Sequence, residues 1–276
     1  MNLIIQGADI ATPDLKQLAK LAGASAIESI SPSAFRLFNA AEHADIAAFC
    51  EQAKLDYAFV PAARRLDAQR LAVMDMDSTL ITIECIDEIA DMQGLKPQVA
   101  AITAAAMRGE LDYPQSLRER VALLKGLDAA ALTRVYNERV RLSPGAEIMI
   151  ARFRRLGIKT LLVSGGFTFL TERIRERLQL DWTRSNVLDI ADDKLTGKVI
   201  GEIVDAGVKR QALLERRDEL GIDREQIIGM GDGANDLQFM GEAGVSIAYR
   251  AKPVVRAQAT HALSHTGLDG VLNLFN

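Results

Sequence analysis

The chain has 276 residues, of which 49% are hydrophobic and 25% are charged, and its formal net charge is −4. Ordinary size priors suggest two domains, and the composition is typical of a globular chain that buries a sizeable core. The mildly acidic charge gives no basic face for nucleic acid, and no apolar run is long enough for a membrane span. Cys50 and Cys85 form no metal-binding pattern, and the N-terminus lacks a charged segment followed by an apolar one, so we expect a cytoplasmic location.

The first 68 residues predict a small α+β domain. Apolar alternation indicates strands at residues 3–6, 26–30, 34–38 and 57–60, and helical spacing indicates helices at 13–21 and 44–53. The order βαββαβ is the ferredoxin-like arrangement that ACT-type amino-acid-sensing modules use. No distinctive ligand motif is visible, so a structural or dimerising role and serine sensing both stay open, and a homodimer is possible. Residues 61–65 follow as the expected linker.

Two carboxylates follow the next strand, which we predict at Leu71–Met74. Asp75 comes directly after that strand, and Asp77 lies two residues further on. Carboxylates at the carboxyl end of a buried parallel strand enter the crevice where α/β proteins bind ligands. Two such anions repel each other in a cleft of low dielectric. A divalent cation would relieve that repulsion.

Three further segments carry polar groups at similar places. A strand predicted at residues 159–163 ends in Ser164 and Gly165, whose hydroxyl and backbone N–H suit phosphate oxygens. Lys209 then begins a helix. A third strand, at residues 226–230, runs into a glycine-rich turn with several acids, which would add cation ligands.

Between the first two core strands, four segments show helical spacing of apolar residues: 83–92, 98–107, 115–124 and 129–140. They predict a helical-bundle cap at about residues 83–142, which would close the site. Alternation over residues 185–200, with Asp192 and Asp193 at a turn, predicts a β-hairpin at the sheet edge. Strands at 245–248 and 262–263 complete a core domain expected to span residues 69–276.

In this order the motifs resemble those of the haloacid dehalogenase-like hydrolases: an Asp-x-Asp pair, a Ser/Thr, a Lys and a distal acidic pair. The resemblance implies an α/β fold with a Rossmann-like parallel sheet and a cap. Within that superfamily the chain is similar to the phosphoserine phosphatases, because Glu84 and Arg120 match the family positions that meet the substrate ammonium and carboxylate. The alternative for both is a solvated helix surface. Tyr113 stands where the family usually has Phe, and Met107 is expected either to line the pocket or to pack in the core of the cap.

The resemblance implies hydrolysis of O-phospho-L-serine to L-serine and phosphate through an aspartyl-phosphate, the last step of serine biosynthesis. Asp75 would be the nucleophile, and Asp77 would act as acid and then as base. A Mg²⁺ ion would bind the Asp75 carboxylate, the Asp77 main-chain carbonyl and the Asp232 carboxylate. Ser164, the N–H of Gly165 and the Lys209 ammonium would hold the phosphoryl oxygens.

Two further assignments come from the same resemblance: Asn235 would bind substrate, and Asp236 would orient Lys209. The chain's histidines, His43, His261 and His265, fall outside the motifs and are expected to be surface or packing residues. Two alternatives stay open for the function. One is a Mg-dependent phosphatase for another small phosphorylated metabolite, and the other is a non-enzymatic amino-acid sensor.

Overall fold

The computed structural model describes all 276 residues. Packing divides the chain into two compact units that each combine several segments. The first consists of Met1–Ala72, Ser143–Lys159 and Ile222–Asn276, and the second of Val73–Leu142 and Thr160–Gly221. The domain boundary expected at residue 68 stays a prediction.

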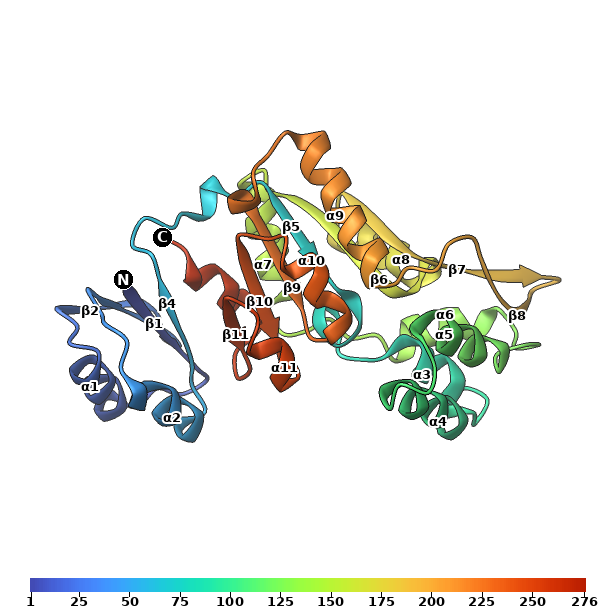
Figure 1. Cartoon of the computed structure of the whole chain (residues 1–276), viewed down its shortest axis with the longest axis horizontal. Helices are drawn as coiled ribbons and strands as arrows, with labels where there is room; N and C mark the ends of the chain where they lie inside the picture. The colour runs from blue at the N-terminus through green and yellow to red at the C-terminus, as the bar shows by residue number, and fades with distance from the viewer. The chain divides into compact units, whose positions relative to one another are not determined.

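The N-terminal segment of the first unit forms a four-stranded antiparallel sheet (Figure 1). The strand order is β2-β3-β1-β4, which confirms the ferredoxin-like arrangement. Its elements are β1 (Asn2–Gln6), α1 (Thr12–Leu21), β2 (Ala26–Ser31), β3 (Ala34–Phe38), α2 (Ala44–Ala53) and β4 (Asp56–Val60). We call residues 1–60 the N-terminal module.

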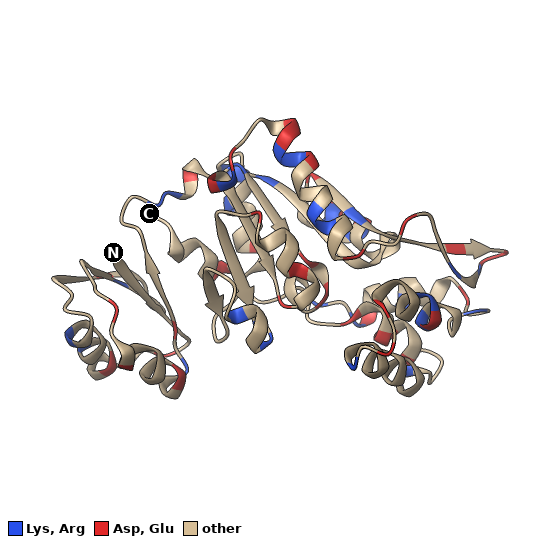
Figure 2. Cartoon of the chain, in the orientation of Figure 1, with Lys and Arg blue, Asp and Glu red and all other residues tan.

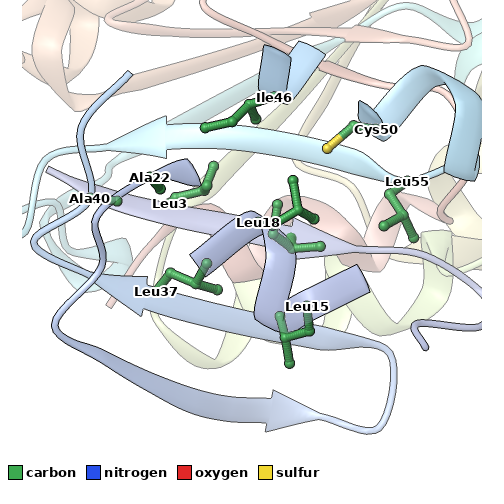
Figure 3. Packing of buried hydrophobic residues seen from close by; sticks show 10 residues of the cluster. Leu3, Leu15, Leu18, Ala22, Leu37, Ala40, Ile46, Cys50 and Leu55 are labelled. Atoms are coloured by element: carbon green, nitrogen blue, oxygen red, sulfur yellow. The ribbon is translucent and has the colours of Figure 1, made fainter. Parts of the chain in front are cut away.

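The core of the N-terminal module lies between the sheet and its two helices (Figure 3). Leu3 of the central strand β1 packs in one cluster with Leu15 and Leu18 of α1 and with Ile46 and Cys50 of α2. Helix α2 begins where His43 Nδ1 accepts a hydrogen bond from the Asp45 N–H at 3.2 Å. The apolar residues whose spacing predicted the two helices are thus the residues that the helices bury in this core.

A second sheet has seven strands in the order β11-β10-β9-β5-β6-β7-β8. The strands are β5 (Leu71–Met74), β6 (Lys159–Phe167), β7 (Trp182–Ala191), β8 (Lys194–Ile200), β9 (Ile227–Gly231), β10 (Val245–Tyr249) and β11 (His261–Leu263). The pairs β9/β10, β10/β11 and β6/β7 are parallel, whereas β7 and β8 form the predicted antiparallel hairpin. Both turn residues, Asp192 and Asp193, have positive φ, as a tight hairpin turn requires. The Rossmann-like α/β class is thus confirmed.

In the first unit, strands β9 to β11 are accompanied by α7 (Ala146–Arg155), α10 (Leu237–Met240) and α11 (Pro253–Arg256). In the second unit, α8 (Thr168–Leu178) and α9 (Ala206–Leu220) follow β6 and β8. Helix α9 carries both acidic and basic residues (Figure 2), as expected for a solvated helix surface. None of the helices combines the length and the apolar character that crossing a bilayer requires.

Four helices are inserted between β5 and β6: α3 (Cys85–Asp91), α4 (Lys96–Met107), α5 (Tyr113–Ala122) and α6 (Ala130–Glu138). Each falls within about two residues of the helix expected from apolar spacing. The chain enters and leaves the insertion at one place, because Ile81 bridges Leu142 and the Thr82 N–H donates to the Arg141 carbonyl at 3.0 Å. The insertion is therefore a helical bundle with a single stem, and it also contacts the β7–β8 hairpin, since the Gly126 N–H donates to the Leu195 carbonyl at 2.8 Å.

Candidate active site

An ion pair between Asp75 and Lys209 is buried in the second unit. Asp75 is the first residue after β5 and is 5% exposed, while Lys209 lies in the first turn of α9 and is 1% exposed. Lys209 Nζ lies 2.5 Å from Asp75 Oδ1. Asp205 fixes the start of α9, since its side chain accepts a hydrogen bond from the Val208 N–H at 2.9 Å. Burying two charges costs less free energy when they face each other, and such a buried pair is a candidate for a site with a chemical task.

The predicted phosphate-binding turn, Ser164–Gly166, lies in the last part of β6, where the pairing with β7 shifts register between Val163 and Phe167. Ser164 is buried, and its Oγ accepts a hydrogen bond from the Gly166 N–H at 2.9 Å. Because that bond uses a lone pair, the hydroxyl hydrogen is left to donate to another acceptor, such as a phosphate oxygen. A methyl group on Gly166 would come within 3.0 Å of Ser164 Oγ and 2.9 Å of Met76 Cε. A larger residue at position 166 would therefore displace the side chains of Met76 or Ser164.

A buried asparagine that sequence reasoning missed supports the same turn. Asn186 of β7 is fully buried, and its Nδ2 donates to the Gly165 carbonyl at 2.8 Å. Its Oδ1 accepts from the Val204 N–H at 2.9 Å, just before α9. One amide thus links Gly165, near the end of β6, to the segment that leads to Lys209. The strand also contains Thr183, Arg184, Ser185 and Asp189, so nothing in the sequence distinguished Asn186 from its polar neighbours.

Asp77 lies in an irregular turn at Met76–Leu80 and is held by Cys85. Cys85 Sγ lies 2.8 Å from Asp77 Oδ1, and the Cys85 N–H donates to Oδ2 at 3.3 Å. Burial, and next the charge of Glu84, raise the pKa of Asp77 to about 7, against the opposing effects of the Cys85 hydrogen bonds and Lys209. A carboxyl group with this pKa can both give and take a proton near neutrality.

The two residues expected to recognise the substrate's amino acid end differ in exposure. Glu84 is exposed, and its Oε1 accepts a hydrogen bond from the Ser78 hydroxyl at 2.7 Å. Ser78 has a φ of 57°, an unfavourable backbone conformation for a serine that is typical of functional turns. Arg120 of α5 is half-buried, and its Nε donates to the Ser116 carbonyl at 3.3 Å.

Tyr113, the first residue of α5, connects the cap to the groups above. Burial raises the pKa of the Tyr113 hydroxyl, and the charges of Lys209, Arg120, Asp75 and Asp77 all act on it. Its Oη donates to the Gly165 carbonyl at 3.4 Å. The hydroxyl that distinguishes this residue from phenylalanine therefore has a partner. Asp75, Asp77, Lys209 and Arg120 thus all contribute to the electrostatic environment of this one hydroxyl.

Of the two expectations for Met107, the structure contradicts one, and the other, that it lines the pocket, stays a prediction. Its side chain is 73% exposed at the end of α4, so the interpretation as core packing of the cap is wrong. The helix ends there, and the chain turns at Arg108 and Gly109 before α5 begins, which leaves the side chain without apolar neighbours to cover it.

The distal acidic turn belongs to the first unit. Asp236 is fully buried, and its Oδ2 accepts hydrogen bonds from the N–H groups of Asp232 at 3.2 Å and Gly233 at 3.0 Å. Asn235, expected to bind substrate, is exposed. A methyl group on Gly231 would come within 2.5 Å of the Asp236 carboxylate, which explains that glycine. Asp236 is thus the residue that shapes the turn presenting Asp232.

One group of acidic side chains in the chain could hold a metal ion, and it consists of Asp75, Asp232 and Asp236. Each offers one carboxylate oxygen. Hard oxygen donors of this kind suit Mg²⁺ or another divalent cation. The group contains the two carboxylates that the sequence assigned to the metal, Asp75 and Asp232, and adds Asp236.

A family model described as haloacid dehalogenase-like hydrolase matches residues 72–241. The chain belongs to this family. A model described as a domain of unknown function matches residues 3–46.

The similar proteins narrow the family. The chain is 56% identical over 215 residues to a phosphoserine phosphatase from Polaromonas sp. (strain JS666), covering 76% of this chain and 91% of the relative. The solved structure of a probable phosphoserine phosphatase from Vibrio cholerae, in an unliganded form, matches with a TM-score of 0.88 at 35% identity, over 99% of this chain and 85% of that one. A structure described as a phospho-aspartyl intermediate analogue of phosphoserine phosphatase matches with a TM-score of 0.70 at 37% identity, over 75% and 99%.

Proposed function

We propose that the protein is a phosphoserine phosphatase that hydrolyses O-phospho-L-serine to L-serine and phosphate, the last step of serine biosynthesis. The observation that carries this proposal is the buried contact between Asp75 and Lys209, in a chain whose similar proteins are phosphoserine phosphatases. A carboxylate held against an ammonium group is suited to attack a phosphorus atom whose oxygens are negatively charged.

The reaction runs in two steps on the residues of the second unit. In the first, an oxygen of Asp75 forms a bond to phosphorus, the bond from phosphorus to the serine oxygen breaks, and Asp77 gives that oxygen a proton. In the second, Asp77 takes a proton from the water that attacks the aspartyl-phosphate, and Asp75 is released. The pKa of about 7 lets Asp77 serve in both steps near neutral pH. Ser164, the N–H of Gly165 and Lys209 hold the phosphoryl oxygens.

The carboxylates of Asp75 and Asp232 and the main-chain carbonyl of Asp77 would hold Mg²⁺, and the Asp236 carboxylate offers a further oxygen. When bound, the ion offsets the negative charge that phosphate brings to these carboxylates. Asp236 orients Lys209, and Asn235 contributes to substrate binding.

Glu84 and Arg120 select the substrate. Glu84 binds the serine ammonium, and Arg120 binds the carboxylate. Support comes from the charge of Glu84, which acts on Asp77, and from that of Arg120, which acts on Tyr113. The two anchors suit a zwitterionic amino acid better than a simple phosphoester.

Three assignments complete the proposal. Residues 1–68 form an ACT-type domain, and residues 69–276 form the phosphatase domain with its cap at about 83–142. Because both cysteines are free and buried, a reducing cytoplasm suits the protein. A homodimer, and serine binding by the N-terminal domain, stay predictions.

The decisive experiment is a substrate panel of phosphoserine, phosphothreonine and phosphoesters without an amino acid, each measured with Mg²⁺ and with a chelator. We expect phosphoserine to have the highest kcat/KM, the chelator to stop the reaction, and added Mg²⁺ to restore it. Equal kcat/KM for a non-amino-acid phosphoester would contradict the substrate assignment. Full activity with the chelator would contradict the metal.

A further inference from the structure

Cys85 has no role in the mechanism so far, although it touches the proposed acid–base group. It is the first residue of α3, is fully buried, and contacts both oxygens of the Asp77 carboxyl group. The sulfur lies 2.8 Å from Oδ1, and the backbone N–H donates to Oδ2 at 3.3 Å.

The chemistry of the thiol decides the direction of the contact with Oδ1. An S–H group beside a carboxyl oxygen donates to it. The thiol donates to Oδ1 and the backbone N–H donates to Oδ2, so Cys85 holds both oxygens of the Asp77 carboxyl group in place.

The other oxygen, Oδ2, faces the turn that would hold phosphate. A methyl group on Gly166 would lie 3.5 Å from Asp77 Oδ2 and 3.0 Å from Ser164 Oγ. Asp77 Oδ2 and the Ser164 hydroxyl thus both lie close to the open side of Gly166. Oδ2, the oxygen that the thiol does not contact, therefore faces the proposed phosphate turn.

We propose that Cys85 is a positioning residue that, by donating to Oδ1, fixes the Asp77 side chain and leaves Oδ2 as the oxygen that exchanges protons with the substrate and with water. This inference rests on the acid–base role of Asp77 in the proposed function. In the first step the proton moves from Oδ2 to the serine oxygen as its bond to phosphorus breaks. In the second a proton of the attacking water moves to Oδ2 as the bond from Asp75 to phosphorus breaks.

The test compares variants of similar shape that differ in the donor: Cys85→Ser with Cys85→Ala and, should the smaller side chains impair folding, Cys85→Thr with Cys85→Val. Cys50→Ala is the matched control, because Cys50 is the other buried cysteine and packs among apolar side chains of the N-terminal module. With phosphoserine and Mg²⁺ we expect the donor-free variant to lose about tenfold in kcat with little change in KM. The variant with a hydroxyl should recover most of that loss, and Cys50→Ala should match the wild type.

An aryl phosphate separates the two steps. Its leaving group needs no proton, so the first step should stay fast in Cys85→Ala, whereas hydrolysis of the aspartyl-phosphate should slow. A rapid burst of the phenol followed by a slow steady state is therefore expected in Cys85→Ala and not in Cys85→Ser. A purely structural role produces no such burst.

Three results would overturn the proposal: unchanged kcat in Cys85→Ala, equal losses in the serine and alanine variants, or a change confined to KM. If the wild type turns over the aryl phosphate but not phosphoserine, the substrate assignment fails, while the burst measurement still decides the role of Cys85.

Discussion

The N-terminal module and helix α3 each bury one cysteine, one among apolar side chains and the other beside a carboxyl group. Cys50 lies in a cluster of leucine, isoleucine and alanine side chains, and burial raises its pKa to about 12. Cys85 is buried just as fully, but its sulfur contacts the carboxyl group of Asp77. The same residue type thus fills space in one region and makes a polar contact in the other.

The N-terminal module and the second unit also differ in the polar side chains that they bury. The N-terminal module buries Gln6 and Asp56 beside its apolar cluster, whereas the second unit buries Asp75, Lys209, Asn186 and Ser164. Buried polar groups cost free energy unless each finds a partner. Asp56 accepts hydrogen bonds from backbone N–H groups, whereas Asp75 faces the ammonium group of Lys209, so it is the buried pair of opposite charges that distinguishes the second unit.

The largest effect is expected from Asp75→Asn. The amide keeps the shape of the carboxylate but cannot act as the nucleophile, so kcat should fall by roughly four orders of magnitude or more. The control is Asp45→Asn, the same change at an exposed position in the N-terminal module, which should leave turnover unaltered. Activity of Asp75→Asn near that of the wild type would remove Asp75 from its role and with it the contrast between the regions.

A second prediction concerns a buried group that stays neutral. Arg64 Nη1 donates to Nε2 of His261 at 2.5 Å, and burial, followed by the charge of Arg64, lowers the pKa of His261 to about 4. The ordinary pKa of a histidine is 6.5. Lys209 keeps its charge because it faces a carboxylate, whereas His261 faces a cation and loses its proton.

Between these two pKa values the unfolded chain binds a proton that the folded chain does not. The contribution of His261 to the free energy of unfolding is therefore complete above pH 6.5. It is lost as the pH falls toward and below 4, by up to about 3 kcal/mol. Denaturant unfolding at several pH values should show this loss in the wild type and a smaller one in His261→Gln. Parallel curves for the two proteins would mean that His261 is protonated in the folded state.

The smallest effect, and the most specific, is expected at the substrate anchors. Glu84→Gln and Arg120→Ala should each lower kcat/KM for phosphoserine by roughly tenfold to a hundredfold, or about 1.5–3 kcal/mol, and should affect a simple aryl phosphate much less. Arg118→Ala provides the control, because Arg118 lies on the same helix and is exposed. Equal losses on both substrates would indicate that the pair supports the fold of the cap.

The sequence predicted those parts that depend on neighbours along the chain. The strand Leu71–Met74, helix Ala44–Ala53 and the turn at Asp192 follow from apolar spacing and turn chemistry, and the structure confirms them. The contact of Cys85 with Asp77 and the bond of Asn186 to the Gly165 carbonyl could not be predicted in this way. They join residues 8 and 21 positions apart, and their partners become known only once the turns have folded.

Asp56, at the start of β4, is nearly buried, and its carboxylate accepts hydrogen bonds from the backbone N–H groups of Ser264, His265 and Thr266 and from the Thr266 hydroxyl. A strand of the N-terminal module thus satisfies the amide groups that follow the last strand of the other sheet. A chain cut after residue 68 would keep those amides and lose their acceptor. Domain exchange between members of this family therefore requires a replacement for one carboxylate as well as a compatible linker.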